Sequence, residues 1–125
     1  MSKFSAYGML AAMVVLSAIS VLLFRTQINR MPPLPSGLFN RLLFVAQTLM
    51  SPLVALAAVS FGIAFICWTL ASTRLPLSVA YPITSVIYPL VVVGSAIAFH
   101  EPIGWTKIAG LALIMGGLTL VNLNP

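Results

Sequence analysis

Acidic side chains are almost absent from this sequence, which contains one carboxylate side chain, Glu101, in 125 residues. Charged residues of both signs make up only 6% of the chain, whereas hydrophobic residues make up 61%. So few charges cannot cover the exterior of a water-soluble globule, which is normally rich in Lys, Glu, Arg and Asp. The composition therefore excludes a soluble domain and indicates an integral membrane protein.

Groups for catalysis and metal binding are also scarce. The chain has one cysteine, Cys67, and one histidine, His100, so it offers neither an internal disulfide nor a pair of such ligands at metal-binding spacing. It contains no acid–base pair, no nucleophile triad and no phosphate-binding glycine loop. We therefore expect neither an enzyme nor a cofactor or metal site.

The positive charges are spread along the chain and form no patch for a nucleic acid. They lie at or between the apolar runs, which is typical of residues at a membrane interface, namely at Lys3, Arg25, Arg30, Arg41, Arg74 and Lys107. Two of these positions belong to one side and four to the other. The bias favours cytoplasmic first and third connections, with both termini outside.

Four apolar runs are long enough to cross a membrane, which takes about 20 apolar residues. We expect spans at about residues 4–24, 53–71, 78–99 and 105–121. Residues 38–50 form a mildly amphipathic helix that either lies in the interface or begins the second span. With no soluble segment between the spans, the whole chain is expected to be a single transmembrane domain, 1–125.

Prolines and glycines indicate where the spans bend and pack. Pro82 and Pro89 each remove a backbone hydrogen bond inside the third span and should kink it. Such breaks persist in a membrane only where protein or water satisfies the freed carbonyls, so this span should face a cavity or a packed interface. Gly110 and Gly117 lie two helical turns apart, where another helix can approach closely.

The second half of the chain carries a more specific pattern. It consists of Leu-Pro-Leu-Ser-Val-Ala-Tyr-Pro at 75–82, then Ser85, His100-Glu101-Pro102, Gly110 and Gly116-Gly117. This pattern resembles the small multidrug resistance proteins of the drug/metabolite transporter superfamily, and within them the small flippase subunits that export aminoarabinose linked to undecaprenyl phosphate. The resemblance covers about residues 53–122. It implies an all-α, four-helix membrane subunit of the small multidrug resistance fold that works as a dimer in the bacterial inner membrane.

The same resemblance implies where the function lies. The pathway would form between subunits from the first three spans, and the fourth would dimerise through Gly110, Gly116 and Gly117. The drug exporters carry an essential Glu eight residues before a Lys in their first span, and Ser17 stands at that spacing before Arg25. Export of lipophilic cations in exchange for protons therefore lacks its central residue, whereas the lipid-linked sugar flippases tolerate that absence.

Candidate binding residues in the first span are a pair of serines and one arginine. The planar guanidinium of Arg25 suits bidentate bonds to a phosphate, although Arg25 also fits a plain interface anchor. Ser17 and Ser20 lie three residues apart on one helical face. Their hydroxyls suit a sugar, or they pack against a neighbouring helix and bond to their own backbone.

Further candidates follow in the third span and the connection after it. Tyr81, Thr84, Ser85 and Tyr88 form a polar stripe that either lines the pathway or packs between helices, because an uncompensated buried hydroxyl is costly. Tyr81 matches a Tyr of the drug exporters, and Thr84 stands where they have a Trp. Glu101 recognises an amino group on the sugar, pairs with Lys107, or caps the turn.

We therefore expect a flippase subunit that moves a polyprenyl-phosphate-linked sugar across the bacterial inner membrane for modification of the cell envelope. Its partners would be membrane lipids, the glycolipid cargo and a second copy or a similar subunit. One alternative is a small-molecule exporter of the multidrug type. The other is an accessory subunit, without transport activity, of a membrane glycosyltransferase.

Overall fold

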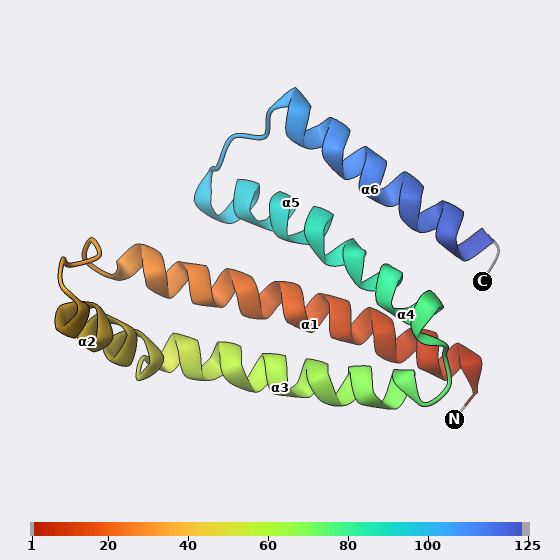
Figure 1. Cartoon of the computed structure of the whole chain (residues 1–125), viewed down its shortest axis with the longest axis horizontal. Helices are drawn as coiled ribbons and strands as arrows, with labels where there is room; N and C mark the ends of the chain where they lie inside the picture. Colours follow the sequence, from red (N-terminus) through yellow and green to blue (C-terminus); the bar gives the residue numbers. More distant parts are fainter. Residues whose placement is uncertain (1, 124–125) are drawn as a thin grey trace.

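The computed structural model describes residues 2–123, which form helices joined by short connections (Figure 1). Four helical segments are long and apolar enough to cross a membrane: α1 (Lys3–Arg30), α3 (Pro52–Ser72), the third span Leu77–Phe99, and α6 (Trp105–Leu123). A shorter helix, α2 (Leu38–Leu49), separates the first two spans. The all-α membrane architecture expected from the sequence is confirmed.

The first helix is longer than the sequence analysis expected. It does not end near Phe24 but continues to Arg30, because the first helix-breaking prolines come only at Pro32 and Pro33. A helix of 28 residues is about 42 Å long, which exceeds the hydrocarbon thickness of about 30 Å. Helix α1 is therefore longer than the hydrocarbon core is thick.

Helix α2 is separate from the second span. A turn at Met50 and Ser51 ends it, and α3 begins at Pro52, where the Ser51 hydroxyl accepts a hydrogen bond of 3.2 Å from the Val54 N–H. Its 12 residues extend about 18 Å, too short to cross a bilayer. The second span thus begins at Pro52 rather than near residue 38, and α2 lies at the end of the bundle where α1 ends (Figure 1).

The third span is broken where the sequence has its two prolines. It consists of α4 (Leu77–Ile83), the 3-10 turn η1 (Thr84–Val86) and α5 (Ile87–Phe99). Pro82 lies inside α4 and Pro89 in the first turn of α5, so the helical hydrogen bonding is weakened on both sides of η1. The two expected kinks take the form of one tighter turn between the prolines.

The tightest packing is between α1 and α3, which run antiparallel side by side (Figure 1). Ala57, Ala64 and Ala71 are buried on α3 and recur every seven residues, which places small side chains on one face toward α1. The largest buried side chain is Leu10 of α1, which is 1% exposed. Small residues on α3 therefore allow the close approach that forms the core.

Helix α6 contributes nothing to that core. None of its residues is buried, and it meets the rest of the chain mainly at α4 and η1. Figure 1 shows it diverging from α5 toward the connection that joins them. Most of the apolar surface of α6 is left uncovered by the chain itself.

Candidate substrate cleft

The first three spans line an open cleft with a volume of about 330 Å³. Most of its walls are apolar or aromatic, and three hydroxyl-bearing side chains interrupt them. This combination, a concave apolar surface with a few polar groups, is typical of ligand sites. The lining residues are Met13, Ser17 and Val21 of α1, Phe61, Ala64, Phe65 and Trp68 of α3, and Tyr81, Thr84 and Ile87 of the third span.

One face of α1 connects this cleft to the end of the helix. Met13, Ser17, Val21 and Arg25 follow one another at four-residue steps, so they lie on the same face. The Ser17 hydroxyl donates to the Met13 thioether sulfur at 3.6 Å. A thioether is a weak acceptor, and the hydroxyl can exchange it for a better partner in the cleft.

An aromatic pair forms part of the cleft wall. The rings of Trp68 and Tyr81 meet edge to face, with centroids 6.0 Å apart and planes at 72°. Thr84, the next hydroxyl along, donates its side-chain hydrogen bond to the Tyr81 carbonyl. The sequence analysis did not count Trp68 among the candidate site residues. Its spacing of seven from Phe61 and four from Ala64 was the signal that these residues share one face of α3.

The other hydroxyls proposed from the sequence lie elsewhere. Ser20 is buried and donates a 2.7 Å hydrogen bond to the Ala57 carbonyl, which ties α1 to α3. The Ser85 oxygen is buried and has no hydrogen-bond partner among residues 2–123. Tyr88 is 59% exposed and is not part of the cleft wall. The structure thus brings Ser17, Tyr81 and Thr84 together and separates Ser20, Ser85 and Tyr88 from them.

The two charged candidates line a second cavity. Arg25 and Glu101 both border a space of about 400 Å³ between α1 and α5. Val21 borders this cavity as well as the central cleft. The arginine and the carboxylate are therefore near neighbours of the cleft without lining it themselves.

The three candidate glycines of α6 have open space beside them among residues 2–123. A Cβ added at Gly110, Gly116 or Gly117 would meet nothing within 4 Å outside the helix. Their proposed contact with a second subunit stays a prediction. Gly94 of α5, which the sequence analysis did not single out, has a neighbour instead: its Cβ would lie 2.6 Å from a Leu22 methyl carbon.

Within the part of the chain that the structure describes, no three His, Cys, Asp or Glu side chains gather as a metal site would require. Four apolar spans, the first three of which border a cleft of hydroxyls and aromatic rings, define a small multi-pass membrane protein. The EamA-like transporter family matches residues 1–123. The chain belongs to that family and is a multi-pass inner-membrane protein, which confirms the resemblance drawn from its second half.

Several relatives are similar over part of the chain. The probable 4-amino-4-deoxy-L-arabinose-phosphoundecaprenol flippase subunit ArnF of Shewanella sediminis is 40% identical over 76 residues, or 58% of this chain and 52% of the relative. The corresponding probable subunit ArnE of Aeromonas salmonicida is 40% identical over 78 residues, or 62% of this chain and 68% of the relative. ArnE of Pseudomonas aeruginosa is 34% identical over 74 residues, or 59% and 64%.

The match spans only about half of the ArnF relative's length. These relatives carry the names of transporter subunits and not of enzymes. A comparison with solved structures gave no match to this chain.

Proposed function

We propose that this chain is one subunit of a flippase that moves a polyprenyl-phosphate-linked sugar across the bacterial inner membrane for modification of the cell envelope. The observation that carries the proposal is the cleft between the first three spans, in which hydroxyls interrupt apolar walls and one face of α1 leads to Arg25. The printed names of the ArnE and ArnF relatives support the class of cargo.

The chemistry of such a cargo matches the layout of the cleft. Its polyprenyl tail can remain in the lipid, while its sugar needs hydrogen-bonding groups along the way, which Ser17, Tyr81 and Thr84 offer. Lys3 and Arg25 lie about 33 Å apart along α1, close to the hydrocarbon thickness. Arg25 is then at the depth of lipid phosphates, where its guanidinium can bind the phosphate of the cargo.

The open cleft also supports a two-subunit assembly. A single chain leaves α6 without a buried residue and the cleft accessible from the side. A homodimer, or a heterodimer with a similar subunit, would cover both. We place the contact on the α6 face that carries Gly110, Gly116 and Gly117, where small side chains allow close helix packing.

The two alternatives receive less support. A multidrug exporter that exchanges protons for cations needs a titratable acid in its binding site, and no carboxylate lines the cleft. An accessory subunit of a glycosyltransferase has no use for a cleft lined by hydroxyls, so it should tolerate their removal.

Native mass spectrometry of the protein, purified gently from its own membranes, tests the proposal. We expect a dimer that carries the mass of a polyprenyl phosphate sugar, and loss of that mass in Arg25→Ala and in the cleft variant Ser17→Leu. Arg74→Ala, at an exposed position in the connection before α4, is the control and should retain the lipid. A dimer that carries only ordinary phospholipids would contradict the proposed cargo, and a stoichiometric glycosyltransferase partner would point to the accessory role.

A further inference from the structure

The second cavity holds an unusual share of the charge of this chain. Its wall contains Arg25 and Lys107, which are two of the six Lys and Arg residues, and Glu101, which is the single carboxylate side chain. Ser95 adds a hydroxyl, and the remaining wall is apolar, formed by Val21, Leu22, Val91, Val92 and Phe99. A charged cluster beside apolar walls suits a ligand that has both kinds of surface.

Three separate elements bring these charges together. Arg25 comes from the C-terminal part of α1, and Lys107 from the first turn of α6. Glu101 follows His100, whose left-handed backbone (φ 55°) ends α5 and turns the chain back toward the cavity. Gly94 leaves room for Leu22 between α5 and α1, because a Cβ at this position would lie 2.6 Å from a Leu22 methyl carbon. The cluster is therefore a product of the fold and not of one sequence segment.

The carboxylate is available to a ligand. Within residues 2–123, no ion pair joins Glu101 to either cation of the cavity, although all three border the same space. Glu101 is partly buried, whereas Arg25 and Lys107 are exposed. A partly buried carboxylate interacts more strongly with a cation than a fully solvated one does, since the local dielectric is lower.

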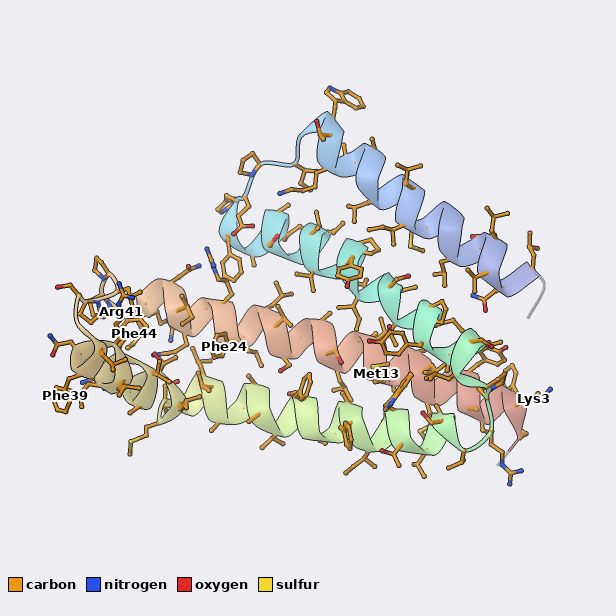
Figure 2. The ribbon with its side chains drawn as sticks, viewed as in Figure 1. Lys3, Met13, Phe24, Phe39, Arg41 and Phe44 are labelled. Carbon is orange, nitrogen blue, oxygen red and sulfur yellow. The ribbon has the colours of Figure 1, made fainter. Side chains whose placement is uncertain are left out.

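The end of the molecule around this cavity is strongly positive. Arg30 and Arg41 also belong to this end, and Figure 2 shows Arg41 at the end of the molecule far from Lys3. Cations in this excess attract a phosphate, and the single acid among them provides a place for a positive group. The arrangement complements a ligand in which an anion and a cation lie close together.

We propose that this cavity is a headgroup subsite for a phosphodiester that carries a primary amine. Arg25 and Lys107 bind the phosphate, and Glu101 binds the ammonium. The inference rests on the proposed flippase function and deepens it, because Glu101 then selects aminated sugars over neutral ones. Val21 borders both cavities, so the headgroup can pass from this subsite into the central cleft along one face of α1.

Two lipids share this chemistry, an amino-sugar polyprenyl phosphate and phosphatidylethanolamine, and a binding experiment separates them. The full-length protein is placed in phosphatidylcholine nanodiscs, and dissociation constants are measured by native mass spectrometry. The ligands are undecaprenyl phosphate 4-amino-4-deoxyarabinose, the same lipid with its amine acetylated, and phosphatidylethanolamine. The proteins are wild type, Glu101→Gln, Lys107→Gln, and the control Arg74→Gln.

We expect Glu101→Gln to weaken binding of the aminated lipid about tenfold or more, as for loss of a hydrogen bond to a charged group, and to leave binding of the acetylated lipid unchanged. Lys107→Gln should weaken binding of both by a similar factor, and Arg74→Gln should weaken neither. Glu101→Asp should recover part of the selectivity, which shows that the charge and not the fold is responsible.

Equal effects of Glu101→Gln on the aminated and acetylated lipids, or no effect on either, would overturn the subsite. If wild type binds phosphatidylethanolamine in a Glu101-dependent manner but binds no polyprenyl lipid, the result supports the subsite and contradicts the proposed cargo. If wild type binds none of the three lipids, both proposals fall.

Discussion

Ser17 and Ser20 lie three residues apart on α1, yet their hydroxyls have different surroundings. Ser20 bonds to the Ala57 carbonyl of α3 at 2.7 Å, whereas Ser17 has only the Met13 sulfur of its own helix and borders the cleft. The first arrangement is a helix contact, and the second leaves a hydroxyl for a ligand. From the sequence, each serine could bind a ligand or pack against a helix. In the structure, Ser20 contacts α3 and Ser17 borders the cleft.

Ser20→Ala should therefore lower stability more than Ser17→Ala. Loss of the bond to Ala57 is expected to cost about 0.6 kcal/mol, the average for interhelical hydrogen bonds in membranes. Ser17→Ala removes only a hydrogen bond to Met13 within α1 and none to another helix. Unfolding of the purified variants with SDS in mixed micelles measures both effects. Equal destabilisation would show that the Ser20 bond does not contribute to helix packing.

A second prediction at this scale concerns Gly94. Gly94→Ala places a Cβ at 2.6 Å from a Leu22 methyl carbon. This methyl is the flexible end of its side chain and can turn away, so we expect a destabilisation of about 1 kcal/mol, the lower end of what overpacking costs. The double variant Gly94→Ala, Leu22→Ala should show less than the sum of the two single effects.

Gly62→Ala is a matched control for this experiment, because its added Cβ would meet nothing within 4 Å. It should be neutral or stabilising, since alanine is the better helix former. Unfolding titrations of the four variants measure these effects. Additive effects of Gly94→Ala and Leu22→Ala would contradict the close approach of α5 to α1.

At the scale of elements, composition and apolar run length were sufficient to predict the four spans. The boundaries were less accessible. The first apolar run ends near residue 24, but backbone hydrogen bonding needs no apolar side chains, and α1 continues to Arg30, just before the prolines. The separation of α2 from α3 depended on the turn at Ser51, where Pro52 begins a new helix, and both arrangements were open in the sequence.

The candidate site was only partly predictable for a related reason. A polar stripe at helical spacing from Tyr81 to Tyr88 assumes one continuous α-helix. The 3-10 turn at 84–86 changes the angle between successive residues, so that Tyr81 and Thr84 border the cleft and Tyr88 does not. Trp68 was missed because its place in the cleft wall depends on contacts between helices that are distant in the sequence.

Helix α2 provides a prediction about the membrane. Leu38, Leu42, Val45 and Leu49 share one exposed face, whereas Gln47 lies on the polar side toward the proline-rich connection. We expect α2 to lie in the interface with this apolar face toward the acyl chains. A bimane label at Leu42→Cys in a Cys67→Ala background should be quenched by brominated lipids, and a label at Gln47→Cys should be quenched much less. Equal quenching would contradict the orientation.

At the scale of the whole molecule, the uncovered α6 is the surface on which we propose that two subunits meet. Gly110→Leu should weaken dimerisation because it fills the space that a second helix would occupy, and Gly62→Leu on α3 is the matched control. Energy transfer between labelled subunits in liposomes measures the effect. If the Gly62→Leu variant dimerises more weakly than the Gly110→Leu variant does, the interface lies on α3 instead.

Transport itself is the central claim, and a leaflet assay tests it most directly. Proteoliposomes are loaded with undecaprenyl phosphate 4-amino-4-deoxyarabinose, and a membrane-impermeant amine reagent labels whatever reaches the outer leaflet. With the wild-type protein and the partner subunit it requires, the reagent should first label the lipid in the outer leaflet (the outer pool) and then, as lipid crosses from the inner leaflet, all of the lipid. Ser17→Leu, which fills the cleft, should stop at the outer pool, and Val59→Leu on the exposed face of α3 should behave as wild type. Full labelling with Ser17→Leu, or labelling that never exceeds the outer pool with wild type, would contradict the account.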